Sequence, residues 1–145
     1  MKTRNKGFSL MELAIAVGLI AILVGVVAAG GGMMGRVRVQ RETEAIDNLR
    51  LASHNYLTPP NLTYSSISIA ALKTEGLLPN NFDPSGANGF GGDYAVSVNS
   101  SDNTRVDISL ANVPSDAATD LTHAFNAKAE AISYDTVNKQ WTATF

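Results

Sequence analysis

The hydrophobic and polar positions divide the chain into two parts of different character. Residues 13–34 form a run of 22 residues without a single charge, most of them apolar. As a helix this run would be about 33 Å long, enough to cross the hydrocarbon core of a bilayer. From Arg36 onward, polar residues alternate with apolar ones at helical spacing. That stripe consists of Ala45, Ile46, Leu49, Ala52 and Tyr56.

These two patterns predict one long helix over residues 8–57, with an apolar first half and an amphipathic second half. The amphipathic stripe predicts the side that packs on a globular domain, and Pro59 and Pro60 end the helix because proline lacks a donor N–H. A short helix is expected before Gly76. Alternating residues then predict strands at 94–98 and 106–110, a helix with Ser115 as N-cap, and strands at 132–137 and 140–145. The fold class is therefore α+β: a long N-terminal helix packed on a small antiparallel sheet.

Glu12 is the one charge in the N-terminal apolar pattern, and it lies directly before the uncharged run of residues 13–34. An ionisable side chain inside a membrane costs on the order of 3 kcal/mol unless it is partnered, so Glu12 is a candidate functional residue. A secretory signal peptide cut near Ala29 would explain the basic start and the apolar run. A charge inside the apolar region and the length of that region both count against this explanation.

The motif Lys6-Gly7-Phe8-Ser9-Leu10-Met11-Glu12-Leu13 resembles the processing site of type IV prepilins and pseudopilins. The resemblance covers roughly the first 35 residues. It implies that a prepilin peptidase cuts between Gly7 and Phe8 and methylates the new amine of Phe8. The implied organisation is a leader peptide at 1–7, a transmembrane and polymerisation helix at 8–35, and the remaining helix plus a pilin-like head at 36–145.

The same resemblance implies an assembly role for Glu12. In this family its carboxylate pairs with the N-terminal amine of another copy, so the product is a homo-oligomeric helical filament. The implied partners are the prepilin peptidase, an assembly platform and a motor ATPase. The subunit would sit in the inner membrane as a single-pass protein, and afterwards in an extracellular type IV pilus, with roles such as cell adhesion. The alternative is a periplasmic pseudopilus of a type II secretion system, and the type IVa and IVb subclasses stay open.

Four glycines, Gly30, Gly31, Gly32 and Gly35, lie between the two halves of the predicted helix. Each interior glycine costs a helix about 1 kcal/mol relative to alanine. One hypothesis is that this segment melts when a filament is formed or stretched. The alternative is that these small residues allow close helix packing.

Charge and composition argue against several function classes. The net charge is −2, and removal of the three basic leader residues would make it −5, which does not favour binding to nucleic acid. There is no cysteine, whereas many pilins carry a C-terminal disulfide, so another interaction must fix the C-terminus. His54 and His123 lack zinc-ligand spacing, and Asp116 and Asp120 are interpreted as a solvated helix face. We expect no enzyme activity and no cofactor. We also expect no metal, although a calcium site at Asp102, Asp107 and Asp135 is the alternative.

Overall fold

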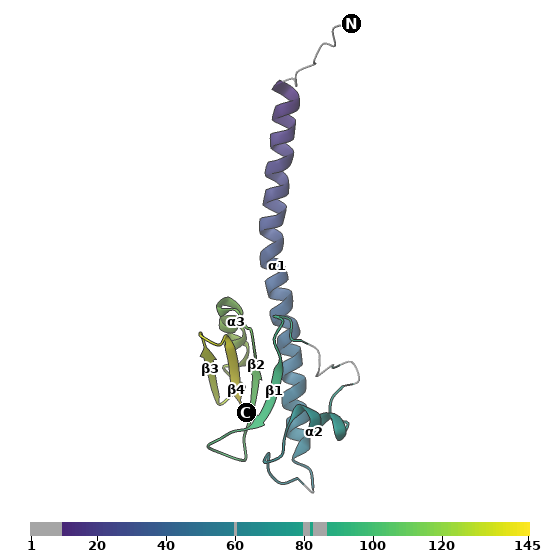
Figure 1. Cartoon of the computed structure of the whole chain (residues 1–145), viewed down its shortest axis with the longest axis vertical. Helices are drawn as coiled ribbons and strands as arrows, with labels where there is room; N and C mark the ends of the chain where they lie inside the picture. The colour runs from purple at the N-terminus through teal and green to yellow at the C-terminus, as the bar shows by residue number, and fades with distance from the viewer. Residues whose placement is uncertain (1–9, 60, 80–81, 83–86) are drawn as a thin grey trace. The chain divides into compact units, whose positions relative to one another are not determined.

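A computed structural model describes residues 10–59, 61–79, 82 and 87–145, and within it the side chains of residues 23 and 25–34 are left undescribed. The chain forms two units, residues 1–35 and residues 36–145. Its elements follow in a simple order (Figure 1). They are α1 (Leu10–Tyr56), α2 (Ile69–Thr74), β1 (Tyr94–Val98), β2 (Val106–Leu110), α3 (Ser115–Phe125), β3 (Ala131–Asp135) and β4 (Gln140–Thr144). The predicted α+β class is confirmed.

Helix α1 agrees with the predicted long helix to within one residue at its C-terminal end. It stops at Tyr56, where the N–H of Leu57 bonds to the carbonyl of His54, three residues before the first proline of the pair. The helical backbone continues through Gly30, Gly31, Gly32 and Gly35. Among the described residues, no helix combines the length and the apolar character that a membrane span requires.

The four strands form one antiparallel sheet in the order β1-β2-β4-β3. The two predicted hairpins are present, because β1 pairs with β2 and β3 pairs with β4. The pairing of β2 with β4, which places Ile108 opposite Ala143, joins the hairpins into a single sheet and was not predicted. It also fixes the C-terminus without a disulfide, since Phe145 and Val106 exchange two backbone hydrogen bonds of 2.9 and 3.0 Å.

One face of this sheet is apolar and packs on helices, as expected for an antiparallel sheet with one wet face. The core contains residues from the second half of α1, from α2 and α3, and from the strands β1, β2 and β4. Its largest fully buried side chains are Trp141, Phe125, Ile46, Leu49, Leu72, Ile108, Leu110 and Leu121. In α1 the predicted stripe is confirmed, although Ile46 is fully buried and Ala45 only half-buried.

Two local predictions were wrong. The N-cap of α3 is Pro114 rather than Ser115, and no side chain caps this helix. Strand β3 ends at Asp135 rather than Val137. The Asp135 carboxylate accepts hydrogen bonds from the backbone N–H groups of Val137 and Asn138, and this local bonding turns the chain before the strand can continue.

Gly92 lies where the segment before β1 passes β2, and its position leaves no room for a side chain. An added Cβ would collide with the backbone carbonyl of Ala111, which is held by the Asn88 amide at 2.8 Å. We expect Gly92→Ala to destabilise the residue 36–145 unit by about 2 kcal/mol or more, the range of overpacked positions. Urea unfolding followed by the fluorescence of Trp141, the single tryptophan, would measure this. Gly35→Ala is the control, because a Cβ there meets nothing within 4 Å; equal losses in both variants would contradict the argument.

Candidate assembly site

The first half of α1 presents apolar side chains all around the helix. Nine of them are between 55% and 87% exposed. They are Leu10, Met11, Leu13, Ile15, Val17, Leu19, Ile20, Ile22 and Val24. A helix that is apolar on every side is normally buried, and apolar surface of this extent marks an interaction site. This segment is therefore built to contact other apolar groups.

Glu12 lies in the first turn of α1 and is exposed. A carboxylate near a helix N-terminus is favoured by the helix dipole, because the first N–H groups have no intrahelical acceptor. Within the described part of residues 10–35 it is the one acidic or basic side chain. Gly7 and Phe8, the predicted processing residues, lie outside the described residues.

A second acidic residue of α1, Glu42, is buried, with only 1% of its surface exposed. Its carboxylate accepts a hydrogen bond from the backbone N–H of Gly89 at 2.8 Å and another from the hydroxyl of Tyr94 at 2.6 Å. Burial, followed by the hydrogen bond and the negative charge of Glu42, raises the pKa of Tyr94 well above its usual value. The phenol is therefore a stable donor at neutral pH, and the contact joins α1 to the start of β1.

Sequence reasoning missed this role of Glu42, although a signal was present. Glu42 lies four residues before Ile46 and seven before Leu49, so it occupies the same helix face as the buried stripe. Extending the stripe by one turn would have placed a carboxylate in the core, where it needs donors. One donor, the N–H of Gly89, comes from the segment before β1, and the other, the hydroxyl of Tyr94, comes from the first residue of β1. No local pattern linked either of them to the helix.

Asn88 organises that segment. Its side-chain oxygen accepts hydrogen bonds from the N–H groups of Phe90 and Gly92 at 2.9 and 3.0 Å, and its amide donates to the carbonyl of Ala111. Asn88 is 3% exposed, so these bonds satisfy an otherwise costly buried amide. The resulting tight turn directs the N–H of Gly89 toward Glu42.

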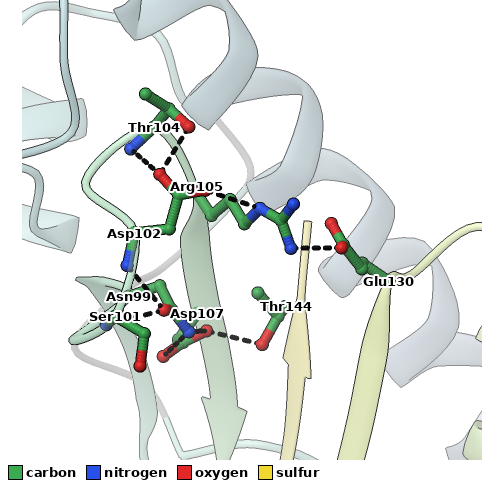
Figure 2. Close-up of polar contacts among 8 residues, drawn as sticks. All are labelled: Asn99, Ser101, Asp102, Thr104, Arg105, Asp107, Glu130 and Thr144. Carbon is green, nitrogen blue, oxygen red and sulfur yellow. Dashed lines mark hydrogen bonds and ion pairs between the residues drawn. The ribbon is translucent and has the colours of Figure 1, made fainter.

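Each of the three aspartates considered for calcium has hydrogen-bond partners of its own, and Figure 2 shows those of Asp102 and Asp107. Asp107 accepts from Asn99 and Thr144, Asp102 accepts from Thr104 and pairs with Arg105, and Asp135 closes the β3–β4 turn. Figure 2 also shows Arg105 reaching from Asp102 to Glu130. In the part of the chain that the structure describes, no group of three or more His, Cys, Asp or Glu side chains could hold a metal ion. These contacts belong to the hairpin turns and to the pairing of β2 with β4.

The two histidines and the acidic pair of α3 do not form a combined site. His54 lies near the C-terminal end of α1, and His123 lies in the last turn of α3. Asp116 and Asp120 are exposed on α3, as expected for a solvated face. Within the described ranges, the features with functional character are thus the apolar surface of the first half of α1 and Glu12.

Comparison with known proteins gives one result for the N-terminal region. Residues 2–28 match the family model described as the prokaryotic N-terminal methylation motif. This motif is the class III signal peptide of type IV pilins and pseudopilins. It supports a pilin-like or pseudopilin substrate of prepilin peptidase, a membrane-anchored precursor and filament assembly. No curated protein and no solved structure matches the chain.

Proposed function

We propose that this chain is the structural subunit of a bacterial type IV pilus, processed by prepilin peptidase and polymerised through its N-terminal helix. One combination of features carries the proposal: the methylation motif at residues 2–28 includes the start of α1, and the apolar side chains of this part of the helix are exposed on all sides. Processing would remove the basic leader and leave this helix on the mature subunit.

During polymerisation, the carboxylate of Glu12 would have a defined cationic partner. Cleavage between Gly7 and Phe8 creates a cationic amine four residues before Glu12. Opposite charges within about 4 Å attract strongly where the dielectric constant is low, while either charge alone is penalised. The amine of one copy paired with Glu12 of another would remove both penalties and set the axial register of the filament.

Before assembly, the same apolar surface would be covered by lipid. We propose a single-pass inner-membrane precursor with the residue 36–145 unit outside the cytoplasm, delivered to an assembly platform and driven by a motor ATPase. Lipid tails are as apolar as the helix surface, so exclusion of water gives little driving force for leaving the membrane. Close helix packing and the Glu12 pair would supply it.

Intact-mass spectrometry of the native protein tests the proposal most directly. The expected mass is that of a chain beginning at Phe8 with one added methyl group. A chain that keeps its first seven residues, or begins near Ala29, would refute the proposed processing. The latter would favour a secreted or tethered binding module instead.

The alternative assembly is the pseudopilus of a type II secretion system, which uses the same motif. Deletion of the gene separates the two. Loss of surface filaments is expected for the pilus subunit, whereas loss of protein export with filaments intact would favour the pseudopilus.

We also propose that the segment with the glycines at 30, 31, 32 and 35 unwinds when a filament is formed or stretched. They form helix in the isolated subunit, where nothing pulls on them. A filament in which residues 29–35 remain continuously helical would remove this proposal and favour close packing through small residues.

A further inference from the structure

The ion pairs of the residue 36–145 unit leave several cations without an acidic partner in the described ranges, and three of these cations lie close together on α1. Asp47 pairs with Arg50 and Lys128, and Arg105 pairs with Asp102 and Glu130. Three arginines that follow the apolar run have no ion pair among the described residues. We call Arg36, Arg38 and Arg41, all exposed, the arginine collar.

The acidic residues that follow the collar do not cancel its charge. Glu42 is buried and already accepts two hydrogen bonds, and Glu44, although exposed, forms no ion pair with the collar. Arg38 and Arg41 are three residues apart and therefore share one face of α1, with Cβ atoms about 5–6 Å apart. Two cationic side chains thus extend into solvent side by side.

Helix α3 carries a matching pair of the opposite sign. Its outer face, defined by Asp116 and Asp120, is exposed, while Ala117, Ala118 and Leu121 of the same helix are buried. Neither aspartate has an ion pair among the described residues. Like charges at this i, i+4 spacing destabilise a helix by about 0.2–0.5 kcal/mol, and a cation from outside the helix would relieve the repulsion.

We propose that the arginine collar of one copy docks on the outer face of α3 in a neighbouring copy, with Arg38 and Arg41 facing Asp116 and Asp120. This inference rests on the proposed filament function. Both surfaces are present on every copy and differ from one another. Such a heterologous contact does not form a two-fold dimer; it generates an open helical filament wherever the rotation between copies does not close into a ring. The two pairs have similar spacing on their helices, so both ion pairs can form at once.

We expect this contact to affect the register between neighbouring subunits and the rate of their association more than the strength of their binding. An exposed ion pair contributes little by itself, and salt screens it. Complementary charge nevertheless accelerates encounter and penalises misaligned partners. A filament repeats the contact at every subunit. Each added subunit would therefore form two electrostatic contacts with earlier copies, the Glu12 pair and the collar contact.

Charge reversal with rescue tests the proposal in cells that assemble the full-length chain. We expect the double variant Arg38→Glu, Arg41→Glu to lower the assembled fraction about tenfold, and Asp116→Arg, Asp120→Arg to do the same. Combining all four substitutions restores the pairing with reversed polarity, and assembly should return to within about threefold of wild type. Sheared filament yield, measured against total subunit, gives the fraction.

Matched controls separate this contact from net charge and from folding. Lys73→Glu with Lys139→Glu makes the same charge change as the collar variant, at exposed lysines without ion pairs in the described ranges, and should leave assembly near wild type. Glu44→Arg with Asp93→Arg is the corresponding control for the α3 variant. Trp141 fluorescence during thermal unfolding verifies that each variant folds.

Each outcome has a defined meaning. Rescue of assembly by the variant with all four substitutions supports the contact between copies, and the absence of rescue overturns the proposal. If the α3 variant assembles normally while the collar variant no longer binds vesicles of anionic phospholipid, the collar contacts lipid and the inference is wrong, although the filament function stands. A wild-type chain that is neither processed nor assembled overturns both.

Discussion

Glu12→Val is expected to abolish filaments, with at least a hundredfold loss of assembled subunit, while the precursor is still made and processed. Valine preserves the apolar surface of α1 but removes the only carboxylate in the described part of residues 10–35. The incoming N-terminal amine would then enter an apolar environment unpaired, at a cost of about 3 kcal/mol or more, which corresponds to a factor of more than a hundred. Electron microscopy and sheared-fraction yield measure assembly, and intact mass measures processing.

Glu44→Val is the matched control for this result. Glu44 is an exposed glutamate of the same helix, and its loss should leave filament yield within a few-fold of wild type. Normal filaments from Glu12→Val would refute the role of the charge pair. Loss of processing in that variant would instead place Glu12 in recognition by the peptidase.

Glu42→Ala is expected to destabilise the residue 36–145 unit by about 3–5 kcal/mol. The substitution leaves the hydroxyl of Tyr94 and the N–H of Gly89, both partly buried, without their acceptor. An unsatisfied donor costs about 1–3 kcal/mol when it is buried, with more lost for bonds to a charged group. Domains of this size are stable by only about 5–15 kcal/mol, so the variant would be close to unfolding at 37 °C. Urea unfolding of the full-length chain in detergent, monitored by Trp141, gives the free energy.

Two variants locate the origin of that loss. Tyr94→Phe removes one of the two bonds and should cost about 1–2 kcal/mol, whereas Glu44→Ala at an exposed position should change stability by no more than about 0.5 kcal/mol. A loss in Glu42→Ala no larger than that of Glu44→Ala would show that the buried contact does not hold the unit together.

The same contact sets an alkaline limit. Burial and Glu42 raise the pKa of folded Tyr94 above its ordinary value of 10.0, although the charge of Arg41 opposes the shift. Stability from this group is therefore complete below about pH 10 and falls as the pH rises toward the higher folded pKa. Tyr94→Phe should reduce this alkaline decline, leaving the part caused by Tyr64, whose pKa is raised by burial.

Much of the fold was readable because its signals are local. A helix from residue 8 to 57 was predicted and α1 ends at Tyr56, since apolar spacing and the two prolines both act within a few residues. Strands 94–98 and 106–110 were placed correctly for the same reason. The end of β3 was not, because the Asp135 side chain bonds to the backbone and ends the strand earlier than the apolar pattern suggests.

By itself, the sequence determined the processing motif, the apolar helix with Glu12 at its start, and the α+β class, because each depends on neighbouring residues or on regular spacing. Only the tertiary structure decided that β2 pairs with β4, and that Glu42 is buried against Gly89 and Tyr94. It also showed that the collar and α3 charges remain without partners in the described unit. The physical reason is distance along the chain: Glu42 and Tyr94 are separated by 52 residues, and a pairing across such a loop is selected by the packing of the whole core.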